Sequence, residues 1–178
     1  MTWRPVLRAT AGTAVALAVG APLGLRPPQL WSGLRHGGAA AVAVAAGVAA
    51  TTLVPSVRTA MRERAVPDSA RRWLAFEIPL GTVVFEEALF RGALASVAGR
   101  GFGPAIGRLV QAGAFGLWHI PDARRAGESV VGTVLVTGLA GWGFGWLAER
   151  SGSVVAPMLA HLAVNEAGAI AALAVRGR

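Results

Sequence analysis

The chain of 178 residues has no cysteine and carries few charged residues. Because cysteine is absent, disulfide bonds and thiolate chemistry are excluded, and the redox compartment is not readable from the sequence. Charged residues make up 15% of the chain, whereas a soluble domain has about 25%. With 54% hydrophobic residues and a mean hydropathy of +0.54, the composition indicates a chain that resides in a lipid bilayer.

Lysine is absent as well, so all 17 basic residues are arginine. Together with abundant alanine, glycine and valine, this indicates the compositional bias of a bacterial genome more than a function. The net charge of +8 raises the question of a nucleic-acid partner. A nucleic-acid-binding chain gathers its basic residues on one stripe with aromatic residues or lysine. Here the arginines lie mostly between apolar runs, as membrane-flanking charges do, so no nucleic-acid partner is predicted.

Apolar runs of about 20 residues, the length that crosses a bilayer, recur along the chain. They predict an all-α fold, a polytopic membrane helix bundle of about six transmembrane helices. The third run contains Glu77 and Pro79, so its membrane part is expected to begin after them. The fourth is the weakest candidate, because it is short and includes Arg108 and Gln111. The predicted spans are 9–25, 37–57, 73–98, 104–120, 130–148 and 153–175.

No second domain is predicted within the 178 residues. Residues 1–72 are expected to hold two N-terminal transmembrane helices and the basic loop 58–72, and residues 73–178 the core of the protein. The first apolar run has a second interpretation, because a basic start followed by a short apolar run ending near Pro22 also resembles a signal peptide.

The placement of arginine predicts which side of the membrane each loop faces. When the loops are assigned alternately, one side receives 11 arginines and the other, which includes Arg100 and Arg108, receives five. Arg91 is left inside a span. The positive-inside rule then places both termini and loop 58–72 in the cytoplasm. The predicted location is the cytoplasmic membrane of a bacterium.

A few polar side chains remain inside the predicted spans, where they are costly and usually face the bundle interior or a water-filled cavity. They come from three separate spans, and they include two of the three histidines and the only asparagine of the chain. The third histidine, His36, is expected in a loop and receives no role. The candidate residues are Glu86, Glu87, Arg91, His119, His161 and Asn165.

Helical spacing predicts how the residues of the third span are arranged. Glu87 and Arg91 are four residues apart, share a helix face and are expected to pair. Glu86 points about 100° away from Glu87 and has no local partner. The cluster is open to a plain interpretation as well, in which it is a structural ion cluster that holds helices together.

The other two spans repeat the same spacing. Phe115 and His119 are four residues apart, as are His161 and Asn165, so each pair points in one direction. A single histidine or asparagine in a membrane helix is more often an interhelical hydrogen-bonding group than a catalyst. The set becomes specific because all three spans contribute polar groups at helical spacing.

These motifs, taken together and in this order, resemble those of the CPBP family. The family comprises the CAAX prenyl proteases and bacteriocin-processing enzymes, also called the Abi family of intramembrane endopeptidases. The resemblance covers roughly residues 73–170, and the motif residues show no departure from the family pattern. The motifs are Glu86-Glu87-x-x-x-Arg91, Phe115-x-x-x-His119 and His161-x-x-x-Asn165.

The resemblance implies hydrolysis of a peptide bond within the membrane by these six residues. In a metal-free scheme, Glu86 helped by His119 takes a proton from water, and His161 with Asn165 donates hydrogen bonds to the oxyanion. Arg91 then holds Glu87. In a second scheme His119, His161 and Glu86 bind Zn²⁺, although the HExxH helix typical of zinc proteases is absent from the sequence. The metal-free scheme, which requires no cofactor, is favoured.

Two other functions fit parts of the pattern. A transporter could use Glu86, Glu87 and His161 as a proton or ion relay, but such proteins usually show inverted repeats, and none is found. An inactive immunity or scaffold protein derived from a protease is the other alternative. For an active enzyme, the expected substrate is a small peptide or a membrane-anchored protein cleaved near its anchor, reached from the cytoplasm.

Overall fold

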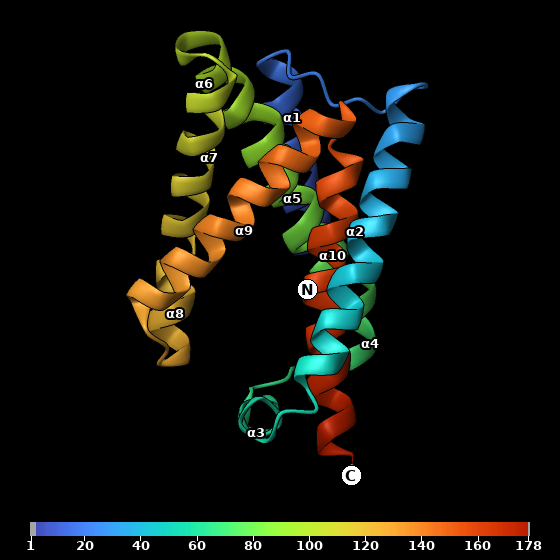
Figure 1. The fold of residues 1–178 in the computed structure, drawn as a ribbon, viewed down its shortest axis with the longest axis vertical. Coiled ribbons are helices and arrows are strands. Elements are labelled where there is room, and N and C mark those ends of the chain that lie inside the picture. The colour runs from blue at the N-terminus through green and yellow to red at the C-terminus, as the bar shows by residue number, and fades with distance from the viewer. Residues whose placement is uncertain (1–2, 178) are drawn as a thin grey trace.

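The computed structural model describes residues 3–177, which fold into helices and contain no strand. The helices form an elongated bundle (Figure 1). In chain order they are α1 (Arg4–Ala18), α2 (Gln29–Thr51), α3 (Pro55–Glu63), α4 (Ala70–Arg72), η1 (Trp73–Val84), α5 (Phe85–Glu87), η2 (Ala88–Leu94), α6 (Ala95–Phe102), α7 (Pro104–Trp118), α8 (Ile120–Ala126), α9 (Val130–Ser151) and α10 (Val155–Arg176).

Prolines and glycines set the boundaries of these helices. Pro104 opens α7, where its missing N–H group leaves no bond unmade, and Gly103 before it has a φ of 85°. A side chain at position 103 would strain this backbone, so the chain turns there and α7 runs back along α6. Gly152, with a φ of 69°, ends α9 in the same left-handed conformation and turns the chain into α10.

The expected all-α bundle is confirmed, but the count of six spans is not. Among residues 3–177, α9 and α10 are long and apolar enough to cross a membrane, and α2 with α3 forms a third span if the 99° bend between them is part of one crossing. Helices α1 and α7 have 15 residues each, about 22 Å of helix, which is shorter than the hydrocarbon core. The stretch 73–102 is helical throughout but is interrupted by wider turns.

Two expected loops contain helix. Helix α2 begins at Gln29, directly after Pro28, so His36 lies inside it and bonds to the carbonyl oxygen of Ser32 through Nδ1 at 2.9 Å. The prediction that His36 lies in a loop was therefore wrong. The basic stretch 58–72 includes the end of α3, which starts at Pro55, and all of α4.

Small residues bring the helices close together. A Cβ atom at Gly37 of α2 would lie 2.8 Å from the Cα of Ala156 on α10, and one at Gly12 of α1 would lie 2.7 Å from the carbonyl oxygen of Phe85. Membrane helices approach each other through such small residues because the hydrophobic effect does not drive their association within lipid. The contact of Gly12 places α1 directly against the start of α5.

The packing of α7 against α9 gives a test of this structure. A Cβ atom at Gly116 would lie 2.6 Å from the carbonyl oxygen of Val134, whereas Gly113 on the same helix has open space around it. We expect Gly116→Ala to destabilise the protein by about 1–3 kcal/mol, as overpacking does. Gly113→Ala is the matched control and should change the stability by less than about 1 kcal/mol, because it adds the same methyl group without a clash. Denaturant titration followed by circular dichroism measures both; equal stability of the two variants would contradict this packing.

Candidate active site

Wide π-helical turns surround the two adjacent glutamates. The short α-helical segment α5 contains Glu86 and Glu87 and lies between the π-helical segments η1 and η2. Pro79 within η1 has no N–H group to donate and disfavours regular α-helical bonding at that point. Such wide turns are rare in proteins and are frequent at functional sites. Both glutamates are buried, Glu87 completely.

Glu87 is the acceptor for two cationic or polar donors from different helices. Its Oε1 atom accepts a hydrogen bond from Nη1 of Arg91 at 3.0 Å, which confirms the predicted pair. The same oxygen lies 2.7 Å from Nδ1 of His161 on α10. A carboxylate accepts hydrogen bonds, so Nδ1 of His161 is the donor in this contact. Glu87 therefore joins α5 to α10 and fixes the orientation of the His161 ring.

Glu86 is held on one side and free on the other. Its Oε1 atom accepts a hydrogen bond from the indole N–H of Trp118 at 3.2 Å. Its Oε2 atom is buried, has no hydrogen-bond partner, and lies 4.0 Å from Nε2 of His161. Glu86 also interacts electrostatically with His119. Helical spacing predicted no local partner for Glu86, and its partners come from α7 and α10.

His119 lies between α7 and α8 with one ring nitrogen already committed. Its Nδ1 atom is 2.8 Å from the carbonyl oxygen of Phe115, which can only accept, so Nδ1 carries a proton. Nε2 is then the atom available for chemistry. The His119 ring meets the edge of Phe115 at 4.7 Å, and Phe115 meets His161 at 5.8 Å, measured between ring centroids. Phe115 thus contacts both imidazole rings.

Asn165 is placed one turn beyond His161 on α10 and bonds within its own helix. Its Nδ2 atom donates to the carbonyl oxygen of His161 at 3.2 Å. The side chain is half-buried. One amide N–H is thereby used, and the second is left for another acceptor. Of the six predicted residues, His119 and Asn165 are the two whose hydrogen bonds run to backbone carbonyl oxygens and not to the two glutamates.

Aromatic rings enclose the charged cluster. The guanidinium carbon of Arg91 lies 4.1 Å from the ring centre of Phe115 and 5.1 Å from that of Phe144, which are favourable cation–π distances. Phe144 also stacks on His161 at 5.1 Å with an interplanar angle of 24°. A Cβ atom at Gly141 would lie 3.0 Å from Phe115, so only glycine leaves room for this ring.

Trp118, Phe144 and Gly141 were not found by sequence reasoning. Trp118 adjoins His119, but nothing in its spacing indicates that it reaches Glu86 on another helix. Phe144 and Gly141 lie in an apolar span where they look like ordinary packing residues. Their roles depend on how α9 crosses the other helices, and the spacing of residues within one helix does not predict that crossing.

The candidate zinc ligands do not form a ready metal site. In the described part of the chain, no group of three His, Asp or Glu side chains is arranged to hold one metal ion. Zinc ligands lie 2.0–2.2 Å from the ion, and second-shell carboxylates orient the ligating imidazoles. The Glu87–His161 contact has that second-shell form, but among the described residues Glu86, His119 and His161 are not arranged to hold one ion together.

A helical membrane bundle in which buried carboxylates meet imidazoles from other helices is an arrangement suited to hydrolysis within the bilayer. The chain belongs to the Rce1-like family: the family model described as type II CAAX prenyl endopeptidase, Rce1-like, matches residues 69–167, more than half of the chain. The matched region includes all six predicted residues. No curated protein and no solved structure matches the chain. The family and the apolar helices make this a membrane protein, and they indicate a CAAX-type intramembrane protease.

Proposed function

We propose that this protein is an intramembrane endopeptidase that cleaves a membrane-associated protein or peptide, with Glu86 as the general base. The observation that carries the proposal is the state of the Glu86 carboxylate. One oxygen is fixed by Trp118, and the other is buried, unpartnered and 4.0 Å from Nε2 of His161. Two atoms at that separation can both contact a single water molecule at ordinary hydrogen-bond distances.

Glu86 takes the proton of the attacking water as its oxygen bonds to the scissile carbonyl carbon. The carbonyl oxygen becomes the oxyanion. When the C–N bond breaks, Glu86 returns the proton to the leaving amine, so the acid and base steps use one group and no net proton is consumed. General bases of this kind contribute about 10²–10⁴ to the rate.

The remaining residues of the set support this step. His161, whose Nδ1 donates to Glu87, orients the water by accepting a hydrogen bond from it at Nε2, and Asn165 supplies its second amide N–H to the oxyanion. His119 assists Glu86 through Nε2. Arg91 is a positioning residue, because it acts on the reaction only through Glu87.

The substrate is proposed to be a small peptide, or a protein cleaved near its membrane anchor. The substrate reaches the active site from the cytoplasm. The chain resides in the cytoplasmic membrane of a bacterium, with both termini in the cytoplasm. The arginine distribution supports this orientation, since 11 of the 17 basic residues fall on the side assigned to the cytoplasm.

The test of the activity uses the purified protein in liposomes. Synthetic peptides that carry an apolar anchor and its flanking residues are supplied in ¹⁸O-labelled water, half of them farnesylated on a C-terminal CAAX sequence. We expect new C-termini that carry the label, because water supplies the new carboxylate oxygen. Cleavage of the farnesylated set alone would identify prenylated substrates, and the absence of cleavage of any anchored peptide would count against the endopeptidase.

Removal of metal tests the mechanism separately. We expect the cleavage rate to stay within twofold after treatment with 1,10-phenanthroline, because Glu86 and its partners need no ion in the proposed scheme. Thermolysin, treated in parallel, is the control that confirms chelation. A loss of activity that added Zn²⁺ restores would overturn the metal-free mechanism and leave the endopeptidase in place.

A further inference from the structure

A cavity of about 720 Å³ opens at the end of the bundle where α6 meets α7, α1 leads into α2, and α9 turns into α10 (Figure 1). Helices α3 and α8 lie at the opposite end. Arg91 is the only one of the six candidate catalytic residues that lines this cavity. The cavity is therefore separate from the space around Glu86 and is connected to it through Arg91.

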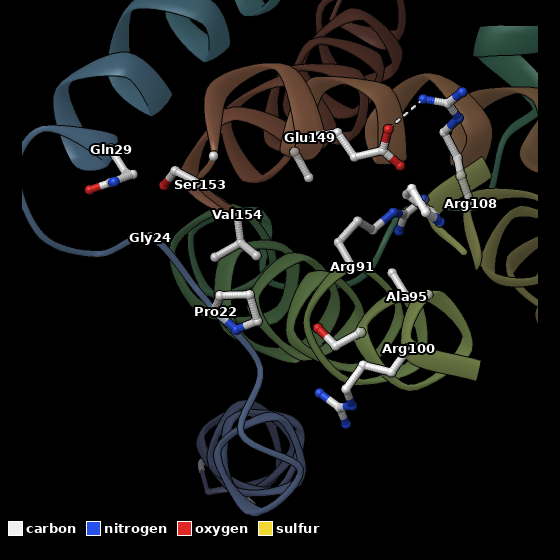
Figure 2. A pocket seen from close by; sticks show the side chains of 15 residues that line it. Pro22, Gly24, Gln29, Arg91, Ala95, Arg100, Arg108, Glu149, Ser153 and Val154 are labelled. Carbon is white, nitrogen blue, oxygen red and sulfur yellow. Dashed lines mark hydrogen bonds and ion pairs between the residues drawn. The ribbon is translucent and has the colours of Figure 1, made fainter. Parts of the chain in front are cut away.

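The cavity is basic and has unused hydrogen-bond donors. Arg91, Arg100 and Arg108 line it together with Glu149 (Figure 2). Nε and Nη2 of Arg91 and Nε of Arg108 are buried without a hydrogen-bond partner. Buried donors left unpaired cost about 1–3 kcal/mol each, and more when they are charged. These three atoms are closed to solvent, so they add positive charge behind the cavity wall. The donors that a ligand can reach belong to Arg100, which is exposed, and to Arg108, whose side chain is 20% exposed.

The charges define the ligand further. Arg91 is balanced by Glu87, and Arg108 is balanced by Glu149 at 2.6 Å, whereas Arg100 bonds only to the backbone oxygen of Val19 among the contacts described. The wall thus carries one excess positive charge. Apart from these groups, Gln29 and two serines, the lining includes apolar residues such as Pro22, Ala95 and Val154. A ligand with one negative charge, several acceptor oxygens and an apolar body fits this lining.

The position of the arginines agrees with such a site. Arg100 and Arg108 are among the five arginines that the sequence places away from the cytoplasm, where basic residues are disfavoured. In Figure 2, Arg91, Arg108 and Glu149 lie together at one side of the cavity, and Pro22 and Ser153 lie at the other. We propose that this cavity binds a membrane phospholipid, with the phosphodiester held by Arg100 and Arg108 and the glycerol and upper acyl chains against the apolar wall.

Lipid binding to the purified full chain tests the proposal and does not depend on proteolysis. Native mass spectrometry in detergent compares phosphatidylglycerol with diacylglycerol, which lacks the phosphate. We expect one phosphatidylglycerol to bind and diacylglycerol to bind at least about tenfold more weakly, as expected for the loss of a charged hydrogen-bonded group. Inorganic phosphate at the same concentration should not displace the lipid. Equal binding of the two lipids, or displacement by phosphate alone, would overturn the proposal.

Two variants locate the site. Arg108→Gln combined with Glu149→Gln removes the donor and its counter-ion together, so no unpaired charge is introduced, and it should weaken phosphatidylglycerol binding about tenfold or more. Ala95→Phe should expel the lipid by filling the cavity while it leaves every arginine in place. Arg150→Gln, an exposed arginine of the same end that does not line the cavity, is the control and should bind like the unmodified protein.

The other possible results of these binding experiments also test the lipid site. Unchanged binding in Ala95→Phe would place the lipid elsewhere and end the proposal, even if the double variant failed to fold. Displacement of the lipid by an anchored peptide with a free C-terminus, lost in the double variant, would assign the cavity to the substrate and would also overturn the lipid site. Thermal unfolding of each variant, followed by circular dichroism, separates lost binding from lost structure.

Discussion

Glu86→Gln should reduce the rate of peptide cleavage by about 10²–10⁴ while the protein stays folded. The amide keeps the size of the side chain and an oxygen that accepts the hydrogen bond of Trp118, but it cannot take a proton from water. The cleavage rate in liposomes and the midpoint of thermal unfolding are measured on the same preparation. The effect is expected in kcat with little change in KM, because the group acts on the reacting water.

The matched control for this variant is Glu77→Gln. Glu77 lies on the same helical stretch, is partly exposed and pairs with Arg72 at 3.0 Å, so the same chemical change is made away from the cluster. Its cleavage rate should stay within twofold of the unmodified protein. Full activity in Glu86→Gln would remove the general base from the mechanism, and a similar loss in both variants would show that the assay reports a general property of the chain.

Glu87→Leu should lower the free energy of unfolding by about 3–5 kcal/mol, because it leaves the buried guanidinium of Arg91 without its carboxylate. Both side chains of this pair are fully inaccessible to solvent. The double variant Glu87→Leu with Arg91→Met removes both charges and should recover most of that stability. Reversible denaturation followed by circular dichroism gives the unfolding free energies.

The two variants also separate a structural ion cluster from a catalytic one. In both of them His161 loses the acceptor of its Nδ1 proton, so its ring is no longer oriented towards Glu86. We expect the double variant to be stable and to cleave at least about tenfold more slowly than the unmodified protein. A stable and fully active double variant would mean that Glu87 and Arg91 only hold helices together. A double variant as unstable as Glu87→Leu would contradict the pairing as the source of the instability.

The spacing of residues along the sequence predicted the contacts that form within a single helix. The pair of Glu87 and Arg91 follows from a separation of four residues, and it is present. The all-α bundle follows from the apolar runs. The boundaries were less accurate, because α2 begins directly after Pro28, ahead of the predicted span 37–57, and Pro55 starts a separate helix inside that span.

The spacing of residues along the sequence did not predict the contacts between helices. The bonds of Glu86 to Trp118 and of Glu87 to His161 join residues 32 and 74 positions apart. They depend on glycines that allow close approach, such as Gly116 and Gly141. The family resemblance singled out the candidate residues without giving these partners, and it gave no indication of the basic cavity beside Arg91.

The pairing of Glu87 with Arg91 keeps the net charge of the site small during the reaction. With neutral imidazoles, Glu86, Glu87 and Arg91 together carry one negative charge. When Glu86 accepts the proton of water, that negative charge is transferred to the oxyanion a few ångströms away, and the total for enzyme and substrate stays the same. No ion has to enter or leave the membrane during the step. The reaction is thus a short internal displacement of charge, which a medium of low polarity accommodates far more easily than a change in its amount.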